Sequence, residues 1–394
     1  MGPLQGIKVL EIEAIGPVPW CGMMLSDMGA EVLRIDRPAQ PSGLRRPPER
    51  FQFANRGRRA VIADLKDSEA IAGVKKLVAK ADVLIEGMRP GVMERLGLGP
   101  DVCLGLNGRL VYGRMTGWGQ GGPLANVAGH DINYIALAGA LHAIGEHGRQ
   151  PVPPLNLVGD FGGGGMLLAL GICAALVRVG ATGQGQVVDA CMIDGVSSLM
   201  TPLFGLLAAG HWRDERGANT LDGGAPWYGV YETADRQYIA VGAIEPQFYS
   251  ALVRGLGIDE REIPSRSERE RWPETRKRFE SIFRSRTRAQ WVETFDGVDA
   301  CVTPVLSLTE AIAHPHQKAR SGFVTIDGIP QPAPTPRFSR TPGQIQGAAR
   351  ERGGGGLQAL RDWGISEEDA EAIIALGGRA APVAPPTTIG EAKS

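Results

Sequence analysis

Residues 7–36 read IKVLEIEAIGPVPWCGMMLSDMGAEVLRID and contain two short apolar runs with a helical segment between them. The runs IKVLEI and EVLRID have the length and composition of buried strands, and WCGMMLSDMGA carries apolar residues at helical spacing. A helix that connects two strands of one sheet makes those strands parallel. This stretch therefore predicts a βαβ unit and an α/β fold.

The same alternation continues after this unit. AVIADL (60–65) and DVLIEG (82–87) read as strands, and the amphipathic segment 67–81 lies between them, with Asp67 or Ser68 as its start signal. A further strand-like run, RLVYGRMTG, occupies residues 109–117. Continuous apolar strands are typical of a parallel sheet that is covered on both faces. The first 120 residues thus predict a doubly wound, Rossmann-like domain.

The second half of the chain predicts a smaller α+β domain and a returning tail. Residues 226–244 alternate like a hairpin with Ala234-Asp235-Arg236 at its tip, and residues 357–378 read as a terminal helical pair. We therefore expect the following division: a large domain at 1–187, a linker at 188–219, a small α+β domain at 220–298, a linker at 299–328, and a C-terminal segment at 329–394 that returns to the large domain.

Composition excludes several classes of partner. The 394 residues are 43% hydrophobic, enough for two cores, and 42 basic against 43 acidic residues give a net charge of -1. We expect no nucleic-acid partner and no membrane partner. The five cysteines show no CxxC spacing, so neither a disulfide framework nor a metal site is predicted. We find no charged leader and no window of about 18 apolar residues, and the C-terminal EAKS is not a peroxisomal SKL signal, so we expect a cytoplasmic protein.

The first strand-to-helix turn argues against a dinucleotide. Gly16-Pro17-Val18-Pro19 lacks the GxGxxG pattern, and its prolines hinder the approach of a pyrophosphate to consecutive amides. Arg37 follows the second strand, where a guanidinium is suited to a ribose phosphate. Other basic residues also lie at strand ends or in the loops after them, where they either converge on one anionic ligand or form a solvated rim: Arg56, Arg58, Arg59, Lys66, Arg89 and Arg95.

Two residues are candidates for acid/base chemistry. His130 follows a glycine-rich stretch at the expected start of a helix, which fits a helix-start or core histidine as well as a catalytic one. Asp160 precedes Gly162–Gly165 and an apolar helix, where an ordinary N-cap is the alternative. The glycines are expected to leave the first-turn amides uncovered by side chains, which suits an anion or a developing oxyanion.

With these residues in place, the sequence resembles the class III CoA-transferase (CaiB/BaiF) superfamily and, within it, the alpha-methylacyl-CoA racemases. The resemblance runs from GIKVLEI (6–12) to TPRFSRTPG (335–343). The segments that carry it are GAEVLRIDRP, ADLK at 63–66, EGMRPGVMERLGLGP, RMTGWGQGGP, GHDINY, PPLNLVGDFGGGG, RGANTLDGGAPWYGVYET and VGAIEPQFY.

The resemblance implies both an architecture and a site. It implies two interlocked subunits, with the active site between the large domain of one and the small domain of the other. His130 and Asp160 would be the two acid/base residues, with Glu245 beside the histidine. The implied CoA-binding residues are Arg37, Ala63, Asp64, Leu65, Lys66, Gly87, Met88, Arg89, Arg95, Gly129, His130, Asp131, Ile132, Asn133 and Tyr134.

The implied reaction inverts the carbon next to an acyl-CoA thioester, and no cofactor is expected beyond the CoA moiety of the substrate. Moving a proton from one face of that carbon to the other requires two acid/base groups. A neutral imidazole, with an unperturbed pKa of about 6.5, can accept a proton near neutral pH. The alternatives are a CoA-transferase in which Asp160 is a nucleophile, and a CoA-ester binding module without catalysis.

Overall fold

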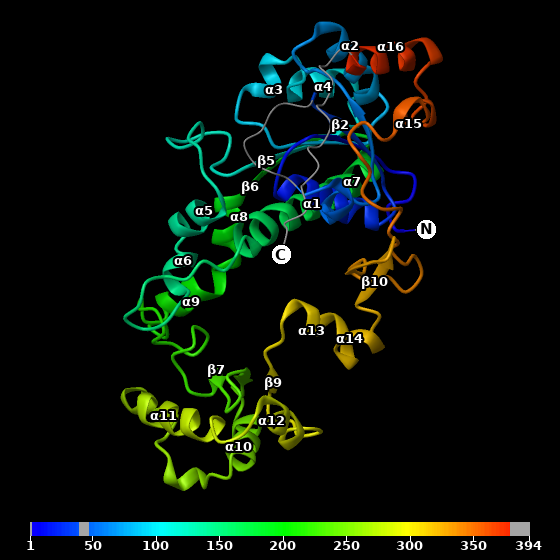
Figure 1. Cartoon of the computed structure of the whole chain (residues 1–394). Helices are drawn as coiled ribbons and strands as arrows, with labels where there is room; N and C mark the ends of the chain where they lie inside the picture. The colour runs from blue at the N-terminus through cyan, green and yellow to red at the C-terminus, as the bar shows by residue number, and fades with distance from the viewer. Residues whose placement is uncertain (1, 39–46, 379–394) are drawn as a thin grey trace, which may run out of the picture. The chain divides into compact units, whose positions relative to one another are not determined.

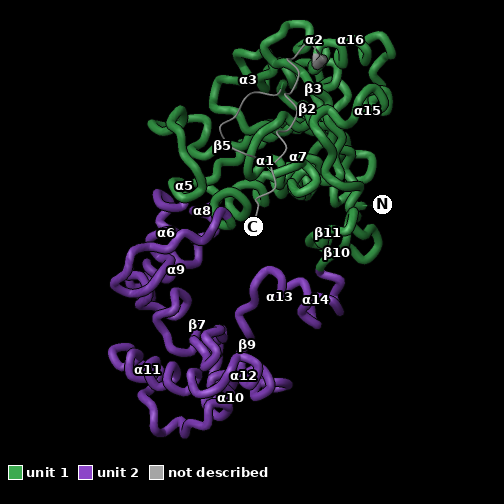
Figure 2. The backbone as a smooth tube through the Cα atoms, viewed as in Figure 1, with its two compact units in different colours: residues 1–134, 157–195, 323–394 green, residues 135–156, 196–322 purple. Residues whose placement is uncertain are grey.

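The structure is a computed structural model that describes residues 2–38 and 47–378. The chain forms two compact units, which Figure 2 shows in different colours. Unit 1 comprises Met1–Tyr134, Leu157–Gly195 and Phe323–Ser394, and unit 2 comprises Ile135–Asn156 and Val196–Gly322. The domain boundaries expected from the sequence stay a prediction.

Unit 1 is built on a six-stranded parallel sheet in the order β3-β2-β1-β4-β5-β6. This is the strand order of doubly wound nucleotide-binding folds. The predicted parallel α/β sheet is therefore confirmed. The strands are β1 (Lys8–Ile12), β2 (Glu31–Asp36), β3 (Arg59–Ile62), β4 (Val83–Glu86), β5 (Val111–Thr116) and β6 (Gln186–Cys191).

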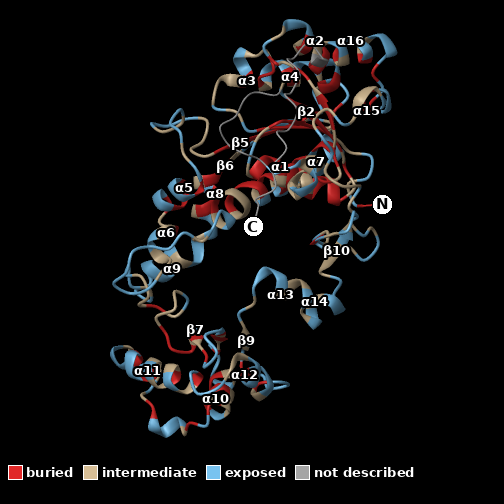
Figure 3. Ribbon diagram, in the orientation of Figure 1, coloured by how far each residue is buried: buried red, intermediate tan, exposed pale blue. Residues whose placement is uncertain are grey.

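Helices cover both faces of this sheet, and β1 to β5 are largely buried, whereas most of β6 is at least partly exposed (Figures 1 and 3). On one face Leu25 of α1 and Ile172 of α7 pack with Val83. On the other face Leu77 of α2 packs with Leu84. The helices are α1 (Pro17–Asp27) and α7 (Leu167–Thr182) on the first face, and α2 (Ser68–Val78), α4 (Pro100–Leu106), α15 (Gly356–Asp362) and α16 (Glu367–Gly378) on the second. A short helix, α3 (Val92–Arg95), follows β4.

The last two helices belong to the core of unit 1. Trp363 and Ile373 are buried in the cluster that contains Leu77. A Cβ added to Gly73 of α2 would lie 2.6 Å from Cγ1 of Ile373, so α2 and α16 pack closely. The helical pair predicted at 357–378 is present as α15 and α16, and the tail covers the sheet beside β3. Ahead of these helices, the tail forms the hairpin of β10 (Phe323–Ile326) and β11 (Ile329–Pro332).

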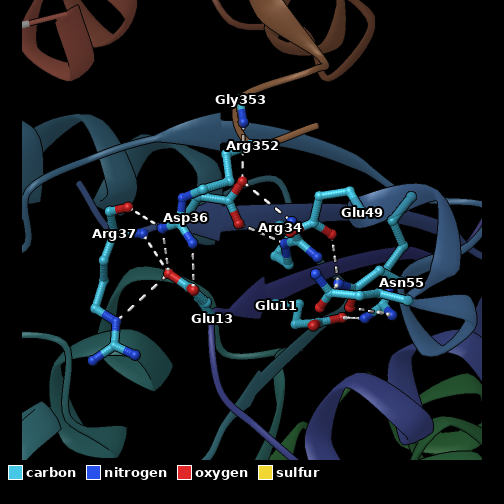
Figure 4. Close-up of polar contacts among 11 residues, drawn as sticks. Glu11, Glu13, Arg34, Asp36, Arg37, Glu49, Asn55, Arg352 and Gly353 are labelled. Atoms are coloured by element: carbon cyan, nitrogen blue, oxygen red, sulfur yellow. Dashed lines mark hydrogen bonds and ion pairs between the residues drawn. The ribbon is translucent and has the colours of Figure 1, made fainter. Parts of the chain in front are cut away.

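Buried charges occupy the α1 face of the sheet near β1 and β2 (Figure 4). Glu11 pairs with Arg58, and Arg34 pairs with Asp36 at 2.5 Å, with all four side chains at most 7% exposed. Gly22 of α1 lies directly against the Glu11–Arg58 pair, where a Cβ would collide with both partners. Burial raises the pKa of Glu11 despite the opposing charge of Arg58, and it lowers the pKa of Arg58. Each charge of the Glu11–Arg58 pair is therefore stabilised in this buried position by the opposite charge of the other.

The expectation that the chain contains no window of about 18 apolar residues is wrong. Among the described residues, the helical run Leu157–Thr182 is long and apolar enough to cross a membrane by length and composition. That criterion is weak evidence, because core helices of globular proteins also meet it. Leu168 and Ile172 in this run are fully buried against the sheet, whereas Leu170 and Val177 on another face of the helix are exposed.

Unit 2 contains a three-stranded antiparallel sheet in the order β7-β8-β9, surrounded by helices. β7 (Tyr228–Glu232) and β8 (Tyr238–Gly242) form the predicted hairpin around residues 234–236. Its core is rich in aromatic side chains, including Trp227, Phe279 and Trp291. The other elements are α6 (Ala140–Ala143), α9 (Thr201–Ala208), α10 (Pro246–Gly255), α11 (Trp272–Phe283), α12 (Arg288–Thr294), β9 (Val302–Pro304), α13 (Leu308–Ala313) and α14 (Pro315–Ala319), and α8 (Met192–Leu199) spans the boundary between the units.

Candidate active site

Some of the residues expected to bind CoA follow the carboxyl ends of β2, β3 and β4 in unit 1, and β1 lies between β2 and β4. Arg37 follows β2, Ala63–Lys66 follow β3, and Gly87–Arg89 follow β4. Because the strands are parallel, these three segments lie at one edge of the sheet. In open α/β sheets ligands bind outside this edge, at the point where the strand order reverses. Here that point lies between β1 and β4.

Arg37 is held in place through Glu13 (Figure 4). The Arg37 amide donates to Glu13 Oε2 at 2.8 Å, and its Nε lies 3.6 Å from the same oxygen. Arg352 from the tail donates to both oxygens of Glu13 at 2.8 Å. Although burial raises the pKa of Glu13, the bonds from Arg352 and Arg37 outweigh it and lower the pKa overall. The Arg37 side chain remains 50% exposed at the edge, where it is accessible to an anion.

The other two segments have well-defined turns. Ala63 donates its amide to the Asp36 carbonyl at 2.9 Å, and Asp64 accepts the Lys66 amide at 3.0 Å. The Met88 amide donates to Glu86 Oε2 at 2.6 Å. Backbone ordered in this way is suited to holding a ligand without rearrangement.

Three of the basic residues considered at sequence level do not converge on this edge. Arg58 is buried on Glu11, and Arg56 is buried on Asp27. Arg59 begins β3 and so lies at the opposite, amino-terminal edge, paired with Glu31 and Asp362. Their acidic partners are 28 to 303 residues away in sequence, which is why the local run gave no sign of them.

His130 immediately precedes α5 (Asp131–Leu137). Its carbonyl accepts the Asn133 amide at 2.8 Å, and its amide donates to Asn133 Oδ1 at 3.0 Å. This reciprocal pair resembles a capping box and fixes the backbone at the helix start. The His130 side chain is exposed, so the imidazole combines a fixed backbone with access to solvent.

Tyr134 orders the loop before His130. Its hydroxyl donates to the Gly129 carbonyl at 2.5 Å, and its ring packs edge-on against Trp118 with centroids 4.7 Å apart. A Cβ at Gly117 would collide with the tyrosine ring, and one at Gly129 would lie 2.8 Å from it. These two glycines therefore allow the loop to pass close to the Tyr134 ring. This packing fixes the backbone just before His130.

Asp160 lies in a π-helix, η3 (Leu157–Met166), which continues directly into α7. The alternative role of Asp160 as the N-cap of this helix is therefore wrong, because the helix begins three residues before Asp160. The glycines after it serve close packing, because a Cβ at Gly165 would lie 2.8 Å from the Pro17 carbonyl oxygen and Gly195 of α8 packs onto the Gly163 carbonyl. Propensity argued for a turn, but these tertiary contacts favour a helix. π-Helical segments are rare overall, and those that occur are often found at functional sites.

A hydrogen bond ties the two candidate segments together. The Asp160 amide donates to Asp131 Oδ2 at 2.7 Å, and Asp131 is the residue after His130. Asp131 is only 7% exposed. A Cβ at Gly16 would lie 3.1 Å from Asp160 Oδ2, so the β1–α1 turn also approaches this carboxyl. His130 and Asp160, 30 positions apart, are thus carried on adjacent segments of unit 1.

Electrostatics also indicate that several predicted residues are neighbours. Burial raises the pKa of the Tyr134 hydroxyl, and the negative charge of Asp160 raises it further. Arg89 lowers it, and Asp131 contributes a smaller increase. Asp131, Asp160 and Arg89 therefore all lie within electrostatic range of one buried tyrosine. This links the acid/base candidates to the segment after β4.

Glu245, in unit 2, is the residue before α10. Its backbone is extended, with φ -72° and ψ 148°, and its side chain is exposed. An exposed carboxylate at a helix start is available to a partner. Its place beside the histidine stays a prediction.

The Asp131 side chain is the contact that sequence reasoning missed, since Asp131 was assigned only to the CoA-binding segment. We expect Asp131→Ala to lower kcat by about 10- to 100-fold, because Asp160 loses its tether and small displacements of reacting groups have effects of this size. Asp131→Asn keeps an acceptor oxygen and should retain more activity. The measurement is kcat for inversion of a 2-methylacyl-CoA. Equal rates for parent and Asp131→Ala would show that the hydrogen bond between Asp131 and the Asp160 amide does not position Asp160.

No group of three or more His, Cys, Asp or Glu side chains in residues 2–38 and 47–378 is arranged to hold a metal ion. The described part of the site thus offers amides, an imidazole, carboxyls and guanidinium groups.

This chain belongs to CoA-transferase family III, which it matches over residues 4–354. It is 45% identical to the alpha-methylacyl-CoA racemase of Mus musculus over 370 residues, covering 93% of this chain and 94% of the relative. It is also 45% identical to the alpha-methylacyl-CoA racemase of Homo sapiens, with 86% and 90% covered. The crystal structure of a CaiB/BaiF family protein from Brucella suis aligns with a TM-score of 0.79 at 25% identity, covering 92% of this chain and 99% of that one.

Proposed function

We propose that this protein is an alpha-methylacyl-CoA racemase, which inverts the carbon next to the thioester of 2-methylacyl-CoA substrates. The observation that carries the proposal is the hydrogen bond between Asp160 and Asp131, which brings the candidate acid and the candidate base, His130, onto adjacent segments. Similarity at 45% identity to two racemases over most of the chain supports the same reaction.

The substrate would bind by its CoA moiety at the carboxyl edge of the sheet. The exposed guanidinium of Arg37 is suited to a phosphate, and the segments 63–66 and 87–89 offer ordered backbone beside it. The acyl end would then reach His130 and Asp160. The chemistry needs no cofactor beyond the CoA moiety.

The proposed reaction is a proton transfer in two steps. His130 removes the α-proton of the S epimer, and the electron pair moves onto the thioester oxygen to form an enolate. Protonated Asp160 then returns a proton to the opposite face, with roles reversed for the R epimer. The enolate oxygen accepts hydrogen bonds from backbone amides beside Asp160 in η3, and one such donor can be worth about 3 kcal/mol of barrier. The amide of Asp160 itself is not among them, because it donates to Asp131.

We further propose that two subunits interlock and that Glu245 of one meets His130 of the other. An exposed apolar stripe on unit 1 supports an interface between copies. Met166, Leu170 and Val177 are 46%, 62% and 76% exposed and share one helical face. Glu245 would fix the histidine tautomer and stabilise its protonated form. The cytoplasmic location and the domain boundaries also remain proposals.

A second function, CoA transfer, is favoured by the family itself. In it the Asp160 carboxylate attacks the thioester carbonyl, the carbon–sulfur bond breaks with release of the CoA thiolate, and an anhydride forms. An exposed histidine on the segment tied to Asp160 has no role in that reaction, so the racemase remains the better supported proposal.

One experiment separates these reactions. The protein is incubated in deuterated water with an S-configured 2-methylacyl-CoA and a free carboxylate such as succinate. We expect deuterium at the α-carbon, accumulation of the R epimer and no succinyl-CoA. Formation of succinyl-CoA without exchange would establish the transferase instead. Saturable binding without either reaction would favour a binding module.

A further inference from the structure

Arg266 of unit 2 is held between two aromatic rings. Its guanidinium lies 4.4 Å from the Trp227 ring centroid and 4.8 Å from that of Tyr249. Its carbonyl accepts a bond from Trp272 Nε1 at 2.9 Å. Trp227 and Tyr249 are 4% and 3% exposed. The guanidinium is therefore fixed at the margin of the aromatic core, in a geometry that favours cation–π attraction.

The fixed guanidinium acts on the turn that carries Glu245. Arg266 Nη2 donates to the carbonyl of Ile244, the residue before Glu245, across 22 positions of sequence. Burial lowers the pKa of Arg266, and the charges of Tyr249, Glu260 and Glu245 oppose that effect. Arg266 is thus within electrostatic range of the Glu245 carboxylate as well as bonded to its neighbour.

The position of Arg266 between the two rings is not well explained by a contribution to the stability of unit 2 alone. Arg266 Nε, Trp227 Nε1 and Tyr249 Oη are buried atoms without a hydrogen-bond partner. Unpaired buried polar atoms cost about 1–3 kcal/mol each, and an apolar side chain between the rings would avoid the unpaired Nε. Charged groups kept at such a cost are often functional.

We propose that Arg266 is a positioning residue for the racemisation, which fixes the Ile244–Glu245 turn and thereby the carboxylate that faces the histidine. This inference rests on the proposed function and on the role of Glu245 within it. Arg266 itself touches no reacting atom. Its planar, multi-donor head allows it to stack on the rings and bond the carbonyl at once, which lysine achieves less well.

The test compares Arg266→Met with the matched control Arg269→Met. Arg269 also stacks on an aromatic ring of this cluster, that of Trp272 at 5.5 Å, but it donates a hydrogen bond to the His211 carbonyl. We expect Arg266→Met to lower kcat by about 10- to 100-fold with KM for the acyl-CoA unchanged. Arg269→Met should match the parent in both constants.

Two further readouts separate positioning from a structural role. The acid limb of the pH profile of kcat/KM should move to lower pH in Arg266→Met, as in Glu245→Gln, because the imidazolium loses its stabilising carboxylate. Adding Arg266→Met to Glu245→Gln should cause little further loss, since both act through one group. Arg266→Lys, which keeps the charge, should recover part of kcat and serves if Arg266→Met fails to fold.

The possible failures are distinguishable. If the parent protein neither exchanges the α-proton nor inverts the substrate, the proposed function itself is wrong. If the parent is active and Arg266→Met equals Arg269→Met in kcat and pH profile, only the role of Arg266 is wrong; the same holds if Arg266→Met does not fold and Arg266→Lys equals Arg269→Met in both. Additive losses in the double variant would also overturn it.

Discussion

The His130→Ala and Asp160→Ala variants are expected to fail on opposite epimers. His130→Ala should slow α-proton exchange of the S epimer by about 10²- to 10⁴-fold, and Asp160→Ala should do the same for the R epimer. Each residue removes the proton from its own face of the carbon, so each variant keeps exchange of the epimer that its remaining base can reach. Inversion needs both residues and is lost in both variants. Deuterium uptake of each pure epimer in deuterated water measures the difference.

Matched controls are available for both substitutions. His142→Ala removes an exposed histidine of α6, and Asp101→Ala removes an exposed aspartate of α4. Both should exchange both epimers at the parent rate. Should His130→Ala and Asp160→Ala do so too, the two-base scheme is wrong.

The second large effect is on stability. Arg58→Met is expected to reduce the free energy of unfolding by about 3–5 kcal/mol, because it leaves Glu11 buried without its partner. Burial already raises the pKa of Glu11 in the parent, so the folded state binds this proton more tightly than the unfolded state. The cost of an ionised Glu11 is therefore present above its unfolded pKa and shrinks as the pH falls. The deficit of Arg58→Met should be largest near neutral pH and decline toward acid pH.

Urea unfolding at several pH values measures this deficit. The double variant Glu11→Leu/Arg58→Met removes both charges and should recover much of the lost stability. Arg271→Met breaks only exposed ion pairs with Glu268 and Glu274, so it should change stability little. A deficit that stays constant from neutral to acid pH would show that the charge of Glu11 is not its cause.

Local pattern was sufficient to predict most of the architecture. Runs such as IKVLEI and EVLRID become β1 and β2, and the hairpin around residues 234–236 is present as expected. These elements bury apolar residues at the period of their own secondary structure, which is visible without knowing the partners. A π-helix has no such signature, and the glycines at 162–165, which were expected in the first turn of the apolar helix, have low helix propensity. Their packing against α1 and α8 outweighs that propensity.

The site was predicted by resemblance more than by pattern. Spacing alone left His130 and Asp160 with ordinary structural alternatives, and it gave no sign that Asp131 joins them. The run Arg56–Arg59 misled, because a buried ion pair such as Arg58–Glu11 depends on residues 47 positions apart. A charged residue is visible in the sequence, whereas the residue that neutralises it is brought close only by the fold.

The tail also has a consequence for the order in which the molecule matures. Gly353 donates its amide to Asp36 Oδ2 at 3.0 Å, and Arg352 bridges to Glu13, so the ends of β1 and β2 are completed by residues made more than 300 positions later. A nascent chain emerging from the ribosome can pair its early strands, but it lacks this support until residues 352 and 353 have been made. The edge of the sheet where we propose that CoA binds is therefore completed only after that point of synthesis.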